Sequence, residues 1–215
     1  KAEKAFREAE EDLDRAAEKL TAARKKIAAE LAEKISAELE DLNFLSAAFE
    51  IGFSGRMVCG RDGKDEISFM IAPNPGEPLR PLSKIASGGE LSRIMLAIKT
   101  LLADKDSTET LLFDEIDTGV SGRTAQKVAE KMMRIGGSRQ VLCITHLAQL
   151  AAMADHHFLI TKGAEAGNTH TVIEELNEEG SVEELARILG GAEITEAVRE
   201  NAAEMKALAR KMKKE

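Results

Sequence analysis

The sequence predicts an α/β protein in which a mostly parallel sheet is flanked by helices and preceded by a long helical arm. Three observations lead to this fold class. Apolar residues recur at heptad spacing near the start of the chain, helical and strand-like segments alternate between residues 90 and 145, and all 16 Gly and 4 Pro lie beyond the first forty residues. Strands that alternate with helices are typical of a parallel sheet covered on both faces, and a stretch without Gly or Pro is typical of a long helix.

The arm is predicted over residues 1–42. Large apolar residues lie seven positions apart, with alanines at the companion positions of the seam: Phe6, Leu13, Leu20 and Ile27, with Ala9, Ala16 and Ala23. This spacing predicts one helix of a coiled coil. After Ile27 the next apolar residue is Leu31, an offset of four that predicts local unwinding of the supercoil as the helix enters the domain. The alternative is an amphipathic helix that packs on the core of its own domain.

Residues 43–215 are predicted to form one compact domain. Its start has two β-like pieces, 49–53 and 67–71, around a turn at 61–63. Four prolines then keep the chain extended up to residue 81. The elements expected after that are helix 90–102, strand 110–114, helix 121–135, strand 140–145, a short helix 147–153, strands 157–162 and 169–175 as a hairpin, helix 181–189 and a last helix from about residue 194. Ser181 and Glu184 fit a capping box that would start the helix ending at Gly190 and Gly191.

Composition limits the class of function. The net charge of -8 provides no overall basic field toward nucleic acid, so any DNA contact must be local or belong to a partner. The two cysteines, Cys59 and Cys143, have no metal-like spacing and suit reduced thiols in the cytoplasm. No signal peptide or membrane-length apolar run is present. Because the chain starts at Lys1 and not at Met, we expect a fragment of a longer protein.

A glycine pair behind a serine precedes the first helix of the domain, in the string Ser87, Gly88, Gly89 and Glu90. Such a string exposes backbone N–H groups and a helix N-terminus, which is how proteins hold phosphate. The alternative is a structural capping box in which Ser87 only starts the helix and the glycines only turn the chain. The two interpretations are compatible.

Two adjacent carboxylates, Asp114 and Glu115, follow the apolar run that begins at Leu111. Ligands collect at the carboxyl ends of parallel strands, so we expect Asp114 to hold Mg²⁺ and Glu115 to orient and deprotonate an attacking water. The alternative is a pair of solvated loop carboxylates. Asp117 and the turn after it, 119–122, would reach the site of a neighbouring subunit.

His146 ends the second apolar strand and should therefore lie at the same sheet edge as Asp114. This position favours a hydrogen bond to a phosphate or to the attacking water over a purely structural role. His156 and His157 are adjacent, so they would face opposite sides of a strand, which disfavours a shared metal. Serine-hydrolase chemistry is excluded, because no complete G-x-S-x-G elbow is present.

The chain lacks a G-x-x-x-x-G-K-[ST] loop, which supplies the backbone cradle and lysine for β- and γ-phosphates. We therefore expect that another segment, a P-loop lobe reached through the coiled coil, completes the nucleotide site.

Together these motifs resemble those of ABC-type ATPase heads. The counterparts are the signature at 87–90, the Walker B strand at 111–115, the D-loop at 117–121 and the switch histidine at position 146. Transporters of this class usually carry glutamine in place of Glu90 and proline in place of Ile116, whereas the glutamate form with a coiled coil directly upstream is similar to the SMC and Rad50 group. Longer strings match a bacterial DNA-repair branch of that group: 74–77, 86–93, 113–119 and 144–149.

The resemblance implies the C-terminal half of an ABC-type ATPase head, with residues 43–215 as the lobe and residues 1–42 as its coiled-coil arm. The catalytic residues would be Glu115 and His146, and the metal ligand would be Asp114. Nucleotide contacts would come from Ser87, Gly88, Gly89, Glu90 and Asp117. In such heads the signature contacts ATP held by the opposite head, whereas Walker B and the histidine act on ATP in their own head.

The implied function is ATP hydrolysis in DNA double-strand-break repair by recombination, in the bacterial cytoplasm at the nucleoid and away from membranes. ATP and Mg²⁺ would be the cofactors. The partners would be the N-terminal P-loop lobe, a second head in a homodimer, DNA and other recombination proteins, and the isolated lobe would be inactive or very weak.

Two alternatives stay open: a non-catalytic module for head and coiled-coil assembly, and the head lobe of another SMC- or Rad50-type protein. The basic clusters 24–26 and 210–214 either touch DNA phosphates or form ordinary solvated helix faces.

Overall fold

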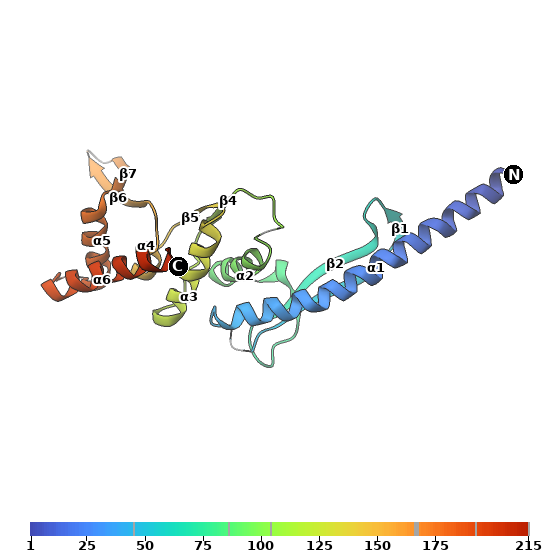
Figure 1. The fold of residues 1–215 in the computed structure, drawn as a ribbon, viewed down its shortest axis with the longest axis horizontal. Coiled ribbons are helices and arrows are strands. Elements are labelled where there is room, and N and C mark those ends of the chain that lie inside the picture. The colour runs from blue at the N-terminus through green and yellow to red at the C-terminus, as the bar shows by residue number, and fades with distance from the viewer. Residues whose placement is uncertain (45, 86, 104, 166–167, 192, 215) are drawn as a thin grey trace. The chain divides into compact units, whose positions relative to one another are not determined.

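The computed structural model describes residues 1–44, 46–85, 87–103, 105–165, 168–191 and 193–214. Its contacts divide the chain into two compact units, Lys1–Ser87 and Gly88–Glu215. The first unit consists of α1 (Ala2–Glu40), β1 (Ala48–Gly60), β2 (Gly63–Ala72), β3 (Arg80–Pro81) and the 3₁₀ helix η1 (Leu82–Lys84) (Figure 1). The predicted division into an arm and a head lobe at residue 42 stays a prediction.

The arm forms the single helix α1, and the two parts of its apolar stripe have different environments. The four heptad residues Phe6, Leu13, Leu20 and Ile27 are exposed, whereas Ile35 and Leu39 are fully buried. The four-residue offset after Ile27 therefore marks the passage from an open stripe to the core. An exposed heptad stripe is what a coiled coil presents before its second helix is in place. Another face of the same stretch packs within the unit, because Ala17 is buried and α1 contacts the β1–β2 hairpin, so the predicted alternative also describes part of residues 6–27.

The β1–β2 hairpin lies alongside α1 (Figure 1). The strands are antiparallel and close through a two-residue turn at 61–62, where Gly63 has a φ of +91° that favours glycine. Asp65 joins the hairpin to the helix, because it accepts hydrogen bonds from the Thr21 hydroxyl at 2.6 Å and from the Arg24 guanidinium at 2.9 Å. The predicted turn and the two predicted β segments are confirmed.

The second unit begins with two helix–strand pairs: α2 (Gly88–Leu101), β4 (Thr110–Phe113), α3 (Gly122–Gly136) and β5 (Gln140–Cys143). β4 and β5 are parallel, with Leu111 beside Val141 and Leu112 beside Leu142. One face of this small sheet is packed, since Leu111 and Phe113 are buried. Every element predicted between residues 90 and 145 is present within a few residues of its expected bounds.

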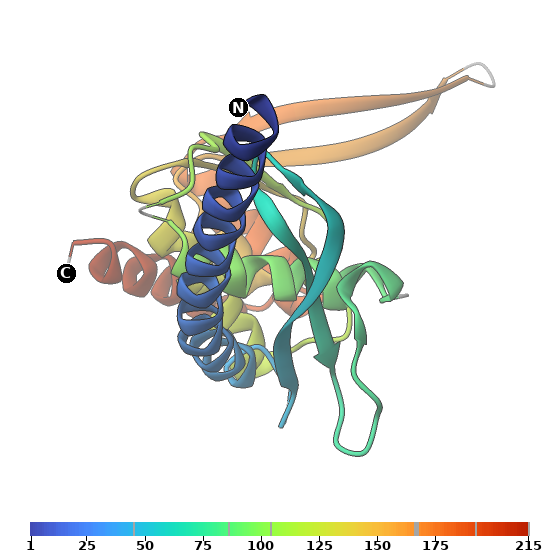
Figure 2. The same cartoon turned by 90° about the vertical axis from the view of Figure 1, so that its right-hand side faces the viewer.

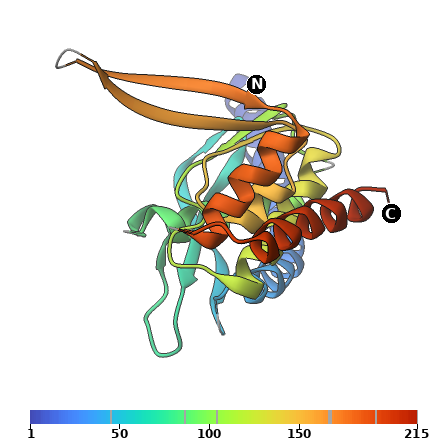
Figure 3. The same cartoon turned by 90° about the vertical axis from the view of Figure 1, so that its left-hand side faces the viewer.

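The rest of the unit is a helical group with a projecting ribbon: α4 (Ala148–Ala152), β6 (His157–Glu165), β7 (Asn168–Leu176), α5 (Glu178–Gly190) and α6 (Glu196–Met212). β6 and β7 pair as the expected hairpin and form a sheet of their own, visible as the long orange ribbon in Figure 2. α5 packs against α6 around Leu185, Ala186 and Ala202 (Figure 3).

The predicted capping box of α5 is wrong. The helix starts three residues earlier than expected, and its cap is Asn177, whose side chain accepts from the Gly180 N–H at 2.8 Å. Ser181 lies inside the first turn at 2% exposure and is hydrogen-bonded to Nδ1 of His157 at 2.9 Å. Glu184 pairs with Arg187. A buried partner for Ser181 explains why its S-x-x-E pattern does not mark the helix start.

His157 should make the stability of this unit depend on pH. Burial and the nearby Lys206 ammonium lower the pKa of His157 below 6.5, with Glu184 opposing them. Because the folded-state pKa is depressed, the stabilisation is present above pH 6.5 and is lost as the pH falls through the folded pKa. We expect the urea midpoint to fall between pH 7.5 and pH 5.5, and to fall less in the variant His157→Gln.

The adjacent His156 gives a matched control, because its side chain is exposed and pairs with Glu175. The variant His156→Gln should keep the pH dependence of the unmodified chain. Equal pH dependence in the His157→Gln variant would show that other groups cause the effect.

Among the described residues, no helix is both long enough and apolar enough to cross a membrane.

Candidate active site

The two predicted carboxylates follow β4 directly and are exposed at its carboxyl end. The Glu115 N–H donates to Oδ1 of Asp114 at 2.9 Å. Glu115 has a φ of +56°, a left-handed conformation that is uncommon for a residue with a side chain. Such backbone strain is concentrated at active sites, where the surrounding structure maintains it.

Asp117 joins the end of β4 to the end of β5. Its carboxylate is 4% exposed, and Oδ2 accepts from the Thr145 hydroxyl at 2.6 Å and from the His146 N–H at 2.8 Å. Nδ1 of His146 lies 3.1 Å from the same oxygen, while the imidazole side chain is 75% exposed. The predicted site residues Asp117 and His146 are therefore in contact, and the imidazole remains open to a ligand.

Helix α2 begins beside the same turn. The Ser92 hydroxyl donates to the Asp114 carbonyl at 2.9 Å, and the buried Arg93 guanidinium donates to the Thr118 carbonyl at 2.7 Å. Burial lowers the pKa of Arg93. These contacts join the second turn of α2 to both ends of the segment that carries Glu115.

The glycine pair at the start of α2 is close to the carboxylate of Glu115. A Cβ placed on Gly88 would overlap Oε2 of Glu115, and one placed on Gly89 would lie 2.9 Å from the Glu115 carbonyl oxygen. Ser87 is exposed immediately before this helix, and Glu90 is half-buried in its first turn. The structure thus brings the signature glycines, the carboxylate pair, Asp117 and His146 to one end of β4 and β5.

This arrangement suits an anion and a hard cation. The first N–H groups of a helix have no partner within the helix and attract phosphate, and α2 has such a start at Gly88 and Gly89. Mg²⁺ in nucleotide sites is held by one or two carboxylates together with phosphate oxygens. Asp114, exposed at the strand end, provides a donor of this kind, so the residues present fit both groups.

Ser92, Arg93 and Thr145 were missed by sequence reasoning. Ser92 and Arg93 lie one helical turn after Gly88 and Gly89, at the i+4 spacing that places residues on one helix face. That spacing predicts that they share a helix face with the glycines, but it does not predict which groups they contact. Thr145 carries no such signal, because its role depends on the meeting of two strand ends.

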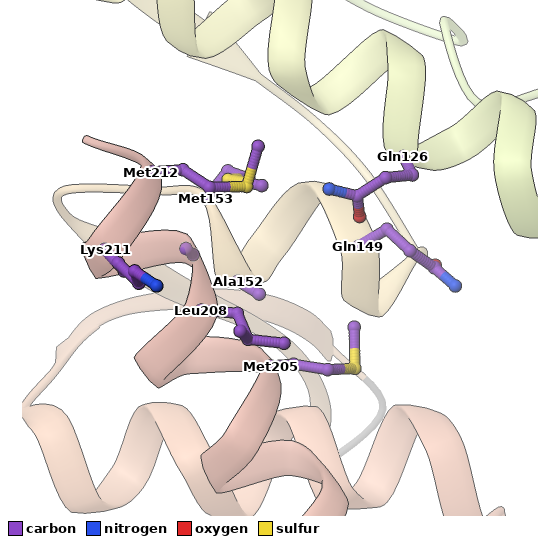
Figure 4. Close-up of a pocket in the computed structure, with 9 residues that line it drawn as sticks. Gln126, Gln149, Ala152, Met153, Met205, Leu208, Lys211 and Met212 are labelled. Atoms are coloured by element: carbon purple, nitrogen blue, oxygen red, sulfur yellow. The ribbon is translucent and has the colours of Figure 1, made fainter. Parts of the chain in front are cut away.

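A pocket in the second unit shares no lining residue with these motifs. It has a volume of about 350 Å³ between α3, α4 and α6. Figure 4 shows Gln126 and Gln149 at one side and methionine side chains along the walls. The lining residues are Gln126, Gln149, Ala152, Met153, Met205, Leu208, Ala209, Lys211 and Met212. None of the predicted site residues is among them.

Cys143 lies on β5 beside the candidate site, and its thiol is unsuited to nucleophilic chemistry. Burial, with the Asp117 and Asp114 carboxylates, raises the pKa of Cys143 to about 12. The thiolate is the reactive form of cysteine, so this residue stays inert at neutral pH.

The basic clusters are partly neutralised within the chain. Arg24 pairs with Asp65, Arg210 with Glu178, and Lys213 with Asp155. These ion pairs favour the solvated-face interpretation over a dedicated DNA-phosphate site.

Comparison with known proteins gives a coherent set of relatives, although no family model matches the chain. The chain is 45% identical to DNA repair protein RecN of Halalkalibacterium halodurans over 206 residues, which cover 94% of this chain and 36% of that protein. It is 42% identical to DNA repair protein RecN of Vibrio cholerae over 191 residues, which cover 88% of this chain and 34% of that protein. The chain therefore spans about a third of the length of these relatives.

One solved structure shows a similar fold. The Smc head domain with a coiled coil and joint from Pyrococcus yayanosii matches with a TM-score of 0.52 and 20% identity, over 76% of this chain and 29% of that chain. The similarity supports the ABC-ATPase-like half-head as the fold class.

Proposed function

This chain is a homologue of DNA repair protein RecN along nearly its whole length, and from that premise we propose that it is the C-terminal lobe of a split ATPase head that acts in DNA double-strand-break repair by recombination. Residues 43–215 form the lobe and residues 1–42 its coiled-coil arm. The proposed setting is the bacterial cytoplasm at the nucleoid, with DNA and other recombination proteins as partners.

The observation that carries the proposal is the meeting of four motifs at one end of β4 and β5. The start of α2, the carboxylates after β4, the buried Asp117 and the exposed His146 side chain are separate in sequence, and contacts within the chain join them. A phosphate-binding helix start beside an acidic strand end is the minimum that nucleotide hydrolysis requires.

Each residue then has a role in a head pair. Glu115 accepts a proton from the attacking water, and His146, whose backbone N–H donates to Asp117, directs its exposed imidazole toward the γ-phosphate. Asp114 holds Mg²⁺, which neutralises charge on the phosphates when ATP is bound. Ser87, Gly88, Gly89 and Glu90 contact the nucleotide held by the opposite head. Asp117 was expected to reach the site of a neighbouring subunit, but it is buried and bonded within its own lobe, so we assign it to its own site instead.

The open face of the small sheet supports the need for a second lobe. Leu112 and Leu142 are register partners, and together with Ile144 they are exposed, while the residues that alternate with Leu112 are buried. Parallel strands are usually covered on both faces. We assign this face to the P-loop lobe, which would also supply the missing phosphate-binding loop.

The variant Leu142→Lys is expected to weaken association with the P-loop lobe by roughly 10- to 10²-fold, because burial of a leucine contributes about 1.5–3 kcal/mol. Titration of one purified lobe into the other measures the change. Val172→Lys is the matched control, since Val172 is similarly exposed but lies on the β6–β7 hairpin. Equal weakening by the two variants would mean that the sheet face is not the contact.

The test of the function is Mg²⁺-dependent ATP turnover by this chain mixed with its P-loop lobe, with and without linear duplex DNA. Turnover that needs both lobes supports the split ATPase, and stimulation by DNA supports the repair role. A complex that binds ATP without turnover would instead favour a non-catalytic assembly module. Normal turnover without any response to DNA would favour a head of another SMC- or Rad50-type protein.

A further inference from the structure

The signature glycine Gly88 and the catalytic carboxylate of Glu115 occupy one small space within the same lobe. A Cβ on Gly88 would overlap Oε2 of Glu115 and lie 3.4 Å from its Cδ, so the free end of the Glu115 side chain would have to move. We propose that Gly88 is a positioning residue for Glu115 of its own head, in addition to its contact with the nucleotide of the opposite head. The inference rests on the proposed ATPase function.

The backbone at position 88 does not itself require glycine. Gly88 is not among the residues with positive φ, and it is the first residue of α2. The backbone conformation at this position therefore accepts alanine as well as glycine. The close carboxylate gives a physical reason for glycine at this place.

The second glycine faces the backbone of the same turn. A Cβ on Gly89 would lie 2.9 Å from the Glu115 carbonyl oxygen and 3.1 Å from the Thr118 carbonyl oxygen. Both signature glycines therefore contact the segment that follows β4, one facing its carboxylate and the other its main chain.

Hydrogen bonds restrict movement of the backbone of residues 114–118. Ser92 and Arg93 hold the carbonyl groups of Asp114 and Thr118, and the Glu115 N–H is bonded to the Asp114 side chain. A methyl group at position 88 would therefore be accommodated by rotation of the Glu115 side chain. Because a misplacement of about 1 Å can cost on the order of 10²-fold in rate, the rotation would disable the base.

The consequence is a link between two sites in a head pair. Gly88 would face the nucleotide of the opposite head on one side and the base of its own site on the other. A substitution at this glycine would then affect both sites, whereas a substitution of Ser87 would affect only the opposite one.

Mixed head pairs separate these effects. Heads with Glu115→Gln are mixed with heads that carry either Gly88→Ala or Ser87→Ala, each in complex with its P-loop lobe, before ATP is added. In every mixed pair one site combines an unmodified signature with an unmodified Glu115. We expect the Glu115→Gln heads to recover turnover when they are mixed with Ser87→Ala heads. The turnover rate recovered with Gly88→Ala heads should be at least tenfold lower. Equal recovery would overturn the inference, while an inactive unmodified complex would refute the proposed function first.

A stability measurement tests the same contact without ATP hydrolysis. The atom that a methyl group at position 88 would displace is the free end of the exposed Glu115 side chain, so Gly88→Ala should shift the melting temperature by less than roughly 2 °C. Gly136→Ala is the control, since a Cβ there meets nothing within 4 Å. A clearly larger loss of stability with Gly88→Ala than with Gly136→Ala would attribute the lost turnover to folding and overturn the inference.

Discussion

A head that carries Glu115→Gln is expected to bind ATP normally and to hydrolyse it 10²- to 10⁴-fold more slowly, the usual contribution of general acid–base catalysis. Glutamine has nearly the shape of glutamate, so the contact near Gly88 is retained while the proton acceptor is lost. Because ATP would bridge two heads until it is hydrolysed, the engaged pair should also accumulate.

Turnover and head pairing are measured on the variant in complex with its P-loop lobe, by phosphate release and by sedimentation with Mg²⁺ and ATP. Glu109→Gln provides the matched control, since Glu109 is an exposed carboxylate just before β4. Turnover at the unmodified rate in the Glu115→Gln complex would show that another group acts as the base.

The variant Asp117→Ala is expected to lower both stability and turnover. Removal of the Asp117 carboxylate leaves the Thr145 hydroxyl and the His146 N–H without their buried acceptor, which costs about 1–3 kcal/mol of folding free energy. The imidazole would also lose its anchor, and a displaced group at a reacting phosphate reduces the rate on the order of 10²-fold. Asp117→Asn retains one carbonyl acceptor, so its stability and turnover should lie between those of the unmodified chain and those of Asp117→Ala.

Thermal unfolding and ATP turnover are compared for the same preparations. Asp155→Ala is the control, because this exposed carboxylate pairs only with Lys213 at the surface among the contacts described. A variant Asp117→Ala that melted normally and turned over ATP at the unmodified rate would contradict the positioning role of Asp117.

Much of the fold could be predicted from periodicity. The heptad stripe predicted α1, and the alternation of apolar runs with helical patterns predicted β4, α3 and β5. The start of α5 could not be predicted, because two local patterns compete there. Asn177 caps the helix, and Ser181 fits the capping pattern but is used by His157, a partner 24 residues away in the chain.

In the candidate site, too, some residues could be identified from the neighbouring sequence, whereas the roles of others depend on tertiary contacts. Asp114, Glu115 and His146 were identified because each follows an apolar strand, a property of adjacent residues. Ser92 and Arg93 act on carbonyl groups more than twenty residues away, so their role depends on how α2 lies against β4. No residue pattern specifies which main-chain oxygen a side chain will meet.

Because the backbone of Glu115 is left-handed, the residue that would be most stable at position 115 differs from the residue that catalysis requires. A residue with a side chain in this region costs about 1–2 kcal/mol relative to glycine, which adopts it freely. Selection for thermostability alone would therefore replace Glu115 with glycine and yield a sturdier chain without a base. In a library sorted only for folding, glycine should become enriched at position 115, and the same library sorted for turnover should recover glutamate.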